Sequence, residues 1–315
     1  MRKIDWRRGW RSGLETTWEL TKVILPVTLV VSVLKYTPVI EWLVKGLTPL
    51  MGWIGLPGEA AVPLALGNLL NLYAAIGAIL TMDLTVKQVL ILAVMLSFSH
   101  NLLVETALCR RVGLNPFLVA SVRIGLAVLS ALLIHLLWSD GGERAFFGWV
   151  GAAEEVPSGW GEIILLALKT ALTGVLQLAL VVIPLMIGIQ VLKDIQVLDR
   201  FAGWMKPLMR PLGLDPRGAV TLAGGLLFGL AMGAGVIIQQ AREQQFSRRE
   251  MTLIILFLAA CHAVVEDTLL FVPLGVNILA LLLIRLGAAI FLTVTVAWLW
   301  PKDRGASVSV RGDHA

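Results

Sequence analysis

Residues 97–106 read Ser-Phe-Ser-His-Asn-Leu-Leu-Val-Glu-Thr, which places a histidine and a glutamate inside an otherwise apolar segment. A related stretch, residues 261–268, reads Cys-His-Ala-Val-Val-Glu-Asp-Thr. The two align at an offset of 162 positions, so that His100 meets His262 and acidic Glu105 meets acidic Asp267. Matching polar residues in matching apolar surroundings indicate an internal duplication.

The likeness extends on both sides of these stretches. Apolar segments can match through shared leucine alone, but that does not bring histidine, asparagine, arginine and proline into register. At an offset of 158 the matching pairs are Pro26 and Pro184, Lys35 and Lys193, Pro49 and Pro207, Gly55 and Gly213, Val62 and Val220, Gly67 and Gly225, and Gly77 and Gly235. At 162 they are His100 and His262, Thr106 and Thr268, Gly113 and Gly275, Asn115 and Asn277, Arg123 and Arg285, Gly125 and Gly287, and Trp138 and Trp300.

The composition is that of an integral membrane protein. Hydrophobic residues make up 57% of the 315 residues, only 15% are charged, and the mean hydropathy is +0.84. A bilayer core is crossed by about 20 apolar residues in a helix. Six apolar runs approach or exceed that length, at residues 20–34, 89–108, 117–138, 163–192, 253–274 and 278–300. We therefore predict an all-α polytopic membrane protein.

The charges of the loops indicate how the copies are oriented, because lysine and arginine concentrate in cytoplasmic loops. The N-terminal arm, residues 1–15, is rich in arginine, whereas the linker at 139–160 is mainly acidic. The loop after the first helix is nearly balanced in copy one and basic in copy two. We therefore expect the arm inside the cell, the linker outside, and the two copies inverted relative to each other.

This inversion requires residues 60–80 and 219–238 to dip into the bilayer and return as re-entrant hairpins. The alternative is a full crossing packed through Gly225, Gly229 and Gly233. With hairpins, repeat 1 covers 16–138 and repeat 2 covers 161–300, followed by a cytoplasmic tail at 301–315. Each repeat has about three transmembrane helices, one amphipathic segment (38–53 or 195–212) and one hairpin.

Ionisable groups inside a membrane helix cost a few kcal/mol each and usually mark a functional site. On unbroken helices, Asn101 and Glu105 share a face and His100 points away from Glu105. In copy two, His262 and Glu266 share a face and can pair directly. We expect a substrate or ion to bind near the midplane at the repeat interface. The candidate residues are His100, Asn101, Glu105, His262, Glu266 and Asp267.

Four further polar residues complete the candidate set. Arg123 and Arg285 are expected to neutralise Glu105 and Asp267 as structural ion pairs. Asn68 and Asn71 lie in the first hairpin segment, where their amides can hydrogen-bond a polar solute. Copy two has Leu226 and Gly229 at those positions, so the pocket would be asymmetric.

Other classes of protein find little support. Histidine and carboxylate ligands suit several divalent ions, but no diagnostic metal spacing occurs, and a metal site stays open. Catalytic and nucleotide-binding signatures such as Gly-x-Ser-x-Gly and the P-loop are absent, so we expect neither an enzyme nor a cofactor. The net charge of +5 is scattered between apolar segments, which does not favour a nucleic-acid partner.

Residues 99–106 with the Gly113-Leu-Asn115 turn and Arg123, and residues 262–268 with the Gly275-Val-Asn277 turn, resemble the Gate (nucleoside-recognition) family of membrane proteins. That family includes spore maturation proteins, the gate regions of ferrous iron transport protein B and part of the concentrative nucleoside transporters. The resemblance covers nearly the whole chain in two copies. It implies an inverted two-gate architecture and passage of a nucleoside-like solute or a metal ion.

The leading hypothesis is a secondary transporter or channel for a small polar, nucleoside-like solute. The alternatives are divalent metal permeation and a non-transporting membrane scaffold or assembly partner. We expect a multi-pass protein of the plasma or inner membrane with both termini in the cytoplasm. Its expected partners are the lipid bilayer, a small polar solute or ion and, as an option, a second copy of itself.

Overall fold

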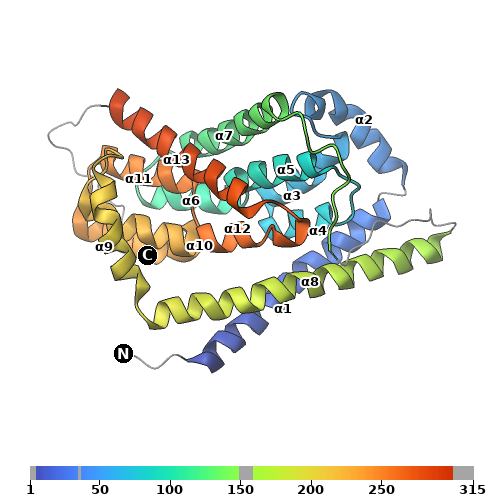
Figure 1. Ribbon diagram of the computed structural model, residues 1–315, viewed down its shortest axis with the longest axis horizontal. Helices are drawn as coiled ribbons and strands as arrows, with labels where there is room; N and C mark the ends of the chain where they lie inside the picture. Colours follow the sequence, from blue (N-terminus) through green and yellow to red (C-terminus); the bar gives the residue numbers. More distant parts are fainter. Residues whose placement is uncertain (1–4, 35–36, 149–158, 301–315) are drawn as a thin grey trace, which may run out of the picture.

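The computed structural model describes residues 5–34, 37–148 and 159–300. The expected tail at 301–315 lies outside the described residues. The described part contains helices and no strand (Figure 1). The first half consists of α1 Trp6–Leu34, α2 Pro38–Gly52, η1 Gly58–Ala60, α3 Ala61–Leu69, α4 Leu72–Ile79, α5 Val86–Ser99, α6 Leu102–Arg111 and α7 Pro116–Leu137. The second half consists of α8 Trp160–Asp194, α9 Val197–Met209, η2 Pro216–Gly218, α10 Ala219–Gln244, α11 Arg248–Ala260, α12 Val264–Leu269, η3 Val272–Leu274 and α13 Ile278–Leu299.

Six stretches are long and apolar enough to cross a membrane: α1, α5 with α6, α7, α8, α11 with α12, and α13. The prediction of an all-α polytopic membrane protein is therefore confirmed. The two stretches that carry His100 and His262, called the histidine helices below, are 72% and 78% buried, whereas the other four are 22–28% buried. Because a lipid-facing helix leaves apolar surface exposed, the histidine helices form the protein-enclosed centre and the other four surround them.

The helices α1 and α8 lie side by side along one edge of the molecule (Figure 1). Gly9 packs against Ile187 and Gly13 against Ile183, so rising residue numbers on α1 meet falling numbers on α8. The pair is therefore antiparallel, as the first helices of two inverted copies would be. The orientation of the copies in a bilayer stays a prediction. Residues 6–15 of the expected N-terminal arm are helical, because α1 begins at Trp6.

Both proposed hairpin segments fold back on themselves. The chain turns between α3 and α4, where the Asn71 side chain accepts a hydrogen bond of 2.9 Å from the Ala74 amide and so caps α4. In α10 the turn falls at Gly229, whose φ of 76° and ψ of 177° are not helical. A Cβ built on Gly233 would lie 3.2 Å from the Gly224 carbonyl oxygen, which shows how closely the two arms approach. Re-entry into the bilayer stays a prediction.

Two cations cap the C-terminal ends of α7 and α13. Lys87 donates to the His135 and Trp138 carbonyl oxygens. At the matching position, 162 residues on, Arg249 donates to the Ala297 and Trp300 carbonyl oxygens over 2.9 and 2.5 Å. The last carbonyls of a helix lack partners within the helix, and a cation there also complements the helix dipole. These cations fix the ends of the two helices that pack against α5 and α11.

We expect Arg249→Met to destabilise the protein by about 1.5–3 kcal/mol, because the partly buried carbonyl oxygens of Ala297 and Trp300 lose hydrogen bonds to a charged donor. The measurement is a thermal melt of the full chain in detergent. Arg248→Met is the matched control, since Arg248 is exposed, and should change stability by less than about 0.5 kcal/mol. If Arg249→Met and Arg248→Met melt at the same temperature, capping of α13 by Arg249 does not stabilise the protein.

Candidate functional site

Both histidine helices are broken at the histidine. The first, α5, ends at Ser99, and Asn101 adopts a left-handed conformation with φ of 50° before α6 begins. The second, α11, ends at Ala260, and Ala263 has φ of 41° before α12 begins. The expectation of unbroken helices over 89–108 and 253–274 is therefore wrong.

The hairpins hold these breaks in place. The Asn101 amide donates to the Gly67 carbonyl oxygen over 2.9 Å, and the Ala263 amide donates to the Gly225 carbonyl oxygen over 3.1 Å. Both glycines sit directly against a leucine of the broken helix, so a side chain there would push the hairpin away. An amide at a left-handed residue thus finds its acceptor on a neighbouring element, which offsets the cost of leaving the helix.

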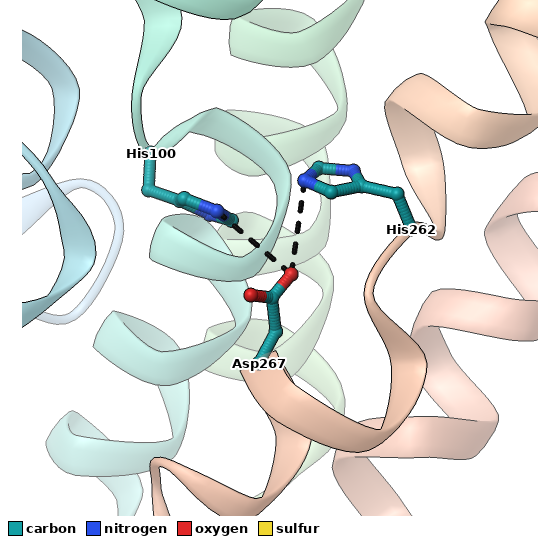
Figure 2. Close-up of side chains that lie close together, drawn as sticks. All are labelled: His100, His262 and Asp267. Atoms are coloured by element: carbon teal, nitrogen blue, oxygen red, sulfur yellow. Dashed lines mark ion pairs between the residues drawn. The ribbon is translucent and has the colours of Figure 1, made fainter. Parts of the chain in front are cut away.

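Side chains from both copies meet at the two breaks (Figure 2). The imidazole rings of His100 and His262 lie with centroids 5.3 Å apart. Asp267 Oδ2 is 3.8 Å from His100 Nε2 and 3.7 Å from His262 Nε2. Glu105 Oε1 is 3.9 Å from His100 Nε2 and 3.2 Å from His262 Nε2. These four side chains, all more than nine-tenths buried, are called the His–carboxylate centre below.

The break explains why His100 does not point away from Glu105. Counting 100° per residue assumes one continuous helix, whereas the extended and left-handed residues at 100 and 101 turn the following helix back toward the imidazole. Counting along a continuous helix also gave the wrong partner for His262 in copy two, where it predicted Glu266. His262 forms its ion pairs with Glu105 and Asp267, and Glu266 instead accepts a hydrogen bond of 2.8 Å from the Tyr73 hydroxyl.

Each carboxylate of the centre is bound by an arginine with no exposed surface. Arg123 Nη1 lies 2.7 Å from Glu105 Oε2, and Arg285 Nη2 lies 3.0 Å from Asp267 Oδ2. The same guanidinium groups donate to carbonyl oxygens at the breaks: Arg123 to Phe98 and His100, over 2.6 and 2.7 Å, and Arg285 to His262, over 2.6 Å. Each arginine therefore neutralises a carboxylate and satisfies backbone that the break releases.

Each histidine is oriented by the helix that precedes it. His100 Nδ1 lies 2.7 Å from the Leu96 carbonyl oxygen, and His262 Nδ1 lies 2.8 Å from that of Leu258. A carbonyl oxygen only accepts, so we assign the hydrogen to Nδ1 in both rings. In a neutral imidazole, Nε2 then carries a lone pair, and it faces carboxylate oxygens that also only accept. The centre is built to take a positive species, either a proton or a metal ion.

The donor set also has the composition of a metal site. The ligand atoms of His100, His262 and Asp267 all lie within 4.8 Å of one another. His262 Nε2 is buried and has no hydrogen-bond partner in the part of the chain that the structure describes.

The three candidate asparagines lie near the centre in the fold but do not join it. Asn71 caps α4, and Asn101 supplies a backbone amide at the break. Asn68 sits on α3, where its buried Oδ1 has no hydrogen-bond partner among the described residues. The second hairpin has Leu226 and Gly229 in place of Asn68 and Asn71, and an asymmetric solute pocket stays a prediction.

Sequence reasoning missed Tyr73. It lies on α4, in the hairpin of copy one, and its hydroxyl reaches Glu266 on α12 of copy two. The available signal was a lone phenol among the alanines and glycines of an apolar hairpin. Glu266 is partly buried and, unlike Glu105 and Asp267, takes part in no arginine ion pair among the described residues.

Six candidate spans, two of them broken around a shared ionisable centre, define a polytopic membrane protein of the transport-related kind. The family model described as Gate, nucleoside recognition, matches residues 17–114 and 175–294. The chain is 50% identical over 308 residues to an uncharacterized membrane protein, YvoD, of Bacillus subtilis (strain 168), and the match covers 98% of each chain. No solved structure matches. The chain belongs to the Gate (nucleoside recognition) family, as the sequence motifs indicated.

The two matched segments contain the whole His–carboxylate centre, since His100 and Glu105 fall in the first and His262 and Asp267 in the second. Arg285 also lies inside the second segment, whereas Arg123 lies outside the first. The four residues of the centre thus all lie in the matched segments, whereas Arg123, which binds Glu105, does not.

We expect Arg123→Met and Glu105→Gln to destabilise the protein by about 3–5 kcal/mol each, because either leaves a buried charge without its partner. The double variant should be less destabilised than the sum, with a coupling of at least about 1 kcal/mol in a double-mutant cycle. Thermal and denaturant unfolding of the full chain in detergent provide the measurement.

The control cycle uses the exposed pair Arg144 and Asp83, whose atoms are 2.6 Å apart but whose side chains are 58% and 56% exposed. Its coupling should be below about 1 kcal/mol, because water screens the pair. If the two double-mutant cycles give the same coupling energy, Arg123 and Glu105 do not act as a buried ion pair.

Proposed function

We propose that this protein is a secondary transporter or channel for a small polar, nucleoside-like solute, and that the solute crosses at the His–carboxylate centre. The observation that carries the proposal is the meeting of two broken spanning helices at one ionisable centre. Broken helices within a membrane are tolerated where protein buries the released backbone or where they line a pathway. Transporters with inverted repeats place substrate and ion sites at such breaks.

The hairpins are the parts that would move to open this pathway. Gly229, at the turn of the second hairpin, lies so close to the break that a Cβ there would be 3.1 Å from Ala263 Cβ and 3.7 Å from His262 Cδ2. Tyr73 of the first hairpin holds Glu266 of the opposite copy. Each hairpin thus contacts a broken helix of copy two next to the centre, and in this proposal access requires at least one hairpin to separate from it.

Glu266 is the proposed first contact of the solute. Its carboxylate accepts only one hydrogen bond among the described contacts, from Tyr73, and is not committed to an arginine. Hydroxyl and amino groups of a nucleoside-like solute donate hydrogen bonds, and could replace the phenol. Asn68 and Asn71 would supply amides on the same hairpin. The role is binding and passage, with no catalysis and no cofactor.

Uptake into proteoliposomes tests the proposal, with radiolabelled uridine and adenosine as probes. Candidate probes are first ranked by their effect on the melting temperature of the purified chain, since a ligand raises it by mass action. Glu266→Gln should slow uptake of the active probe about tenfold, because a charge-assisted hydrogen bond is worth about 1.5–3 kcal/mol. Asp83→Asn, which alters an exposed carboxylate, should not change uptake.

Two outcomes would count against transport. If Glu266→Gln and Asp83→Asn transport equally, Glu266 does not contact the solute. If no nucleoside, nucleobase or organic acid raises the melting temperature and no probe enters the vesicles, while substitutions in the centre still destabilise the fold, the chain acts as a membrane scaffold.

The proposed placement is in the cell membrane, with the linker at 139–160 outside and the basic loops of copy two inside. Cysteine labelling in intact cells tests it, because the native Cys109 and Cys261 are buried. Asp140→Cys should react with a membrane-impermeant maleimide, and Arg242→Cys should react only after permeabilisation. Reaction of both from outside would mean that the second hairpin crosses the membrane completely and would overturn the inverted arrangement.

A further inference from the structure

We propose that the His–carboxylate centre binds one divalent transition-metal ion through His100 Nε2, His262 Nε2 and Asp267 Oδ2, with Glu105 Oε1 as a fourth ligand. The proposal concerns a bound ion and does not depend on which solute is transported. It is carried by the buried donor atoms of His100, His262 and Asp267, which all lie within 4.8 Å of one another, and by Glu105 Oε1, which lies 3.2 Å from His262 Nε2.

The spacing of the donors suits a metal ion. Zinc bonds to histidine nitrogen and carboxylate oxygen are about 2.0–2.2 Å long, so adjacent donors in a tetrahedral site lie roughly 3.3–3.5 Å apart. The four distances from histidine nitrogen to carboxylate oxygen are 3.2, 3.7, 3.8 and 3.9 Å. Small rotations of the side chains bring such donors to one ion, and Figure 2 shows both rings turned toward the same Asp267 oxygen.

The surroundings orient three of the four proposed ligands, whereas Asp267 Oδ2 is also the oxygen that Arg285 Nη2 binds over 3.0 Å, so the ion shares that oxygen with the arginine. The Leu96 and Leu258 carbonyl oxygens hold the hydrogen on Nδ1, which leaves Nε2 as the ligand atom of both rings. Metal-bound histidines commonly donate the other ring N–H to a carbonyl or carboxylate in this way. Arg123 binds Glu105 Oε2 and leaves Oε1 facing the histidines. The orientation of His100, His262 and Glu105 therefore exists before the ion arrives.

The charges near the centre accommodate a divalent ion. With neutral imidazoles, Arg123 and Arg285 balance Glu105 and Asp267, and nearby Glu266 leaves one negative charge in excess. A bound divalent ion changes the net charge from one negative to one positive. The desolvation cost of burying the metal-bound centre is therefore no larger than that of the metal-free centre. Lys193 also attracts the Glu266 carboxylate electrostatically. It is left out of this charge count because its side chain is exposed and water screens its charge. Two imidazole nitrogens favour Zn²⁺, Co²⁺, Fe²⁺ or Ni²⁺ over Mg²⁺ and Ca²⁺.

The test uses the full chain in detergent, stripped with a chelator and titrated with Co²⁺ and then Zn²⁺. We expect one Co²⁺ per chain, visible absorption typical of a nitrogen–oxygen site, displacement by Zn²⁺, and a higher melting temperature with metal than without. Mg²⁺ at the same concentration should produce none of these changes.

The informative variants are His100→Asn and His262→Asn. The asparagine amide can still donate to the Leu96 or Leu258 carbonyl oxygen, so the local hydrogen bond is kept while Nε2 is lost. Each variant should bind Co²⁺ at least about 100-fold more weakly, beyond the loss usual for supporting residues. His135→Asn, on α7 and outside the centre, is the control and should bind like the parent chain.

Folding of each variant is checked by its metal-free melt, and His262→Cys, which offers a thiolate ligand, should retain Zn²⁺. The proposal is overturned if the parent chain binds no metal, or if either asparagine variant that folds binds it as tightly as the parent. It is also overturned if the melting temperature responds to pH but not to metal, which would identify a proton as the occupant. Because no flux is measured, these results stand apart from the uptake experiment.

Discussion

The rest of the structure depends on compensating charge where two membrane helices are broken. A break releases backbone carbonyls, and the histidines and carboxylates beside it add polar and charged groups that the bilayer cannot solvate. Arg123 and Arg285 meet both demands, since each binds a carboxylate and the carbonyl oxygen of the histidine at the break. The breaks at His100 and His262 can therefore persist in the buried middle of the protein.

Neither copy makes a complete site. Glu105 of copy one lies closest to His262 of copy two, and Asp267 of copy two approaches both rings. The shared centre thus arises where the two broken helices face each other, and it exists only when both halves of the chain are folded together. This arrangement gives a reason for keeping both copies in one chain, because any change in their relative position alters the centre directly.

The two copies differ most in the parts that border the centre. The first hairpin turns at Asn71, whose side chain caps α4, and it carries Tyr73, which holds Glu266. The second turns at Gly229, which has no side chain and packs directly on the break. The first hairpin is therefore held next to the centre by a polar hydrogen bond, and the second by close backbone packing.

The sequence by itself determined the membrane class and the six apolar spans, and it named the ionisable residues from which the centre is built. Those features follow from local patterns of hydropathy and from the alignment of the chain with itself, and the family motifs lie in the same segments. Asparagines 68 and 71 lie in the first hairpin, as the sequence indicated, whereas Asn101 lies at the break rather than inside a helix, and a solute-binding role for all three stays a prediction.

Only the tertiary structure decided which of these groups meet. Helical periodicity placed His100 away from Glu105 and paired His262 with Glu266, because it assumed straight helices. The breaks are fixed by hydrogen bonds from Asn101 to Gly67 and from Ala263 to Gly225, which join residues far apart in the chain. No local pattern encodes such contacts, so the centre and its orientation belong to the packed fold, while its ingredients belong to the sequence.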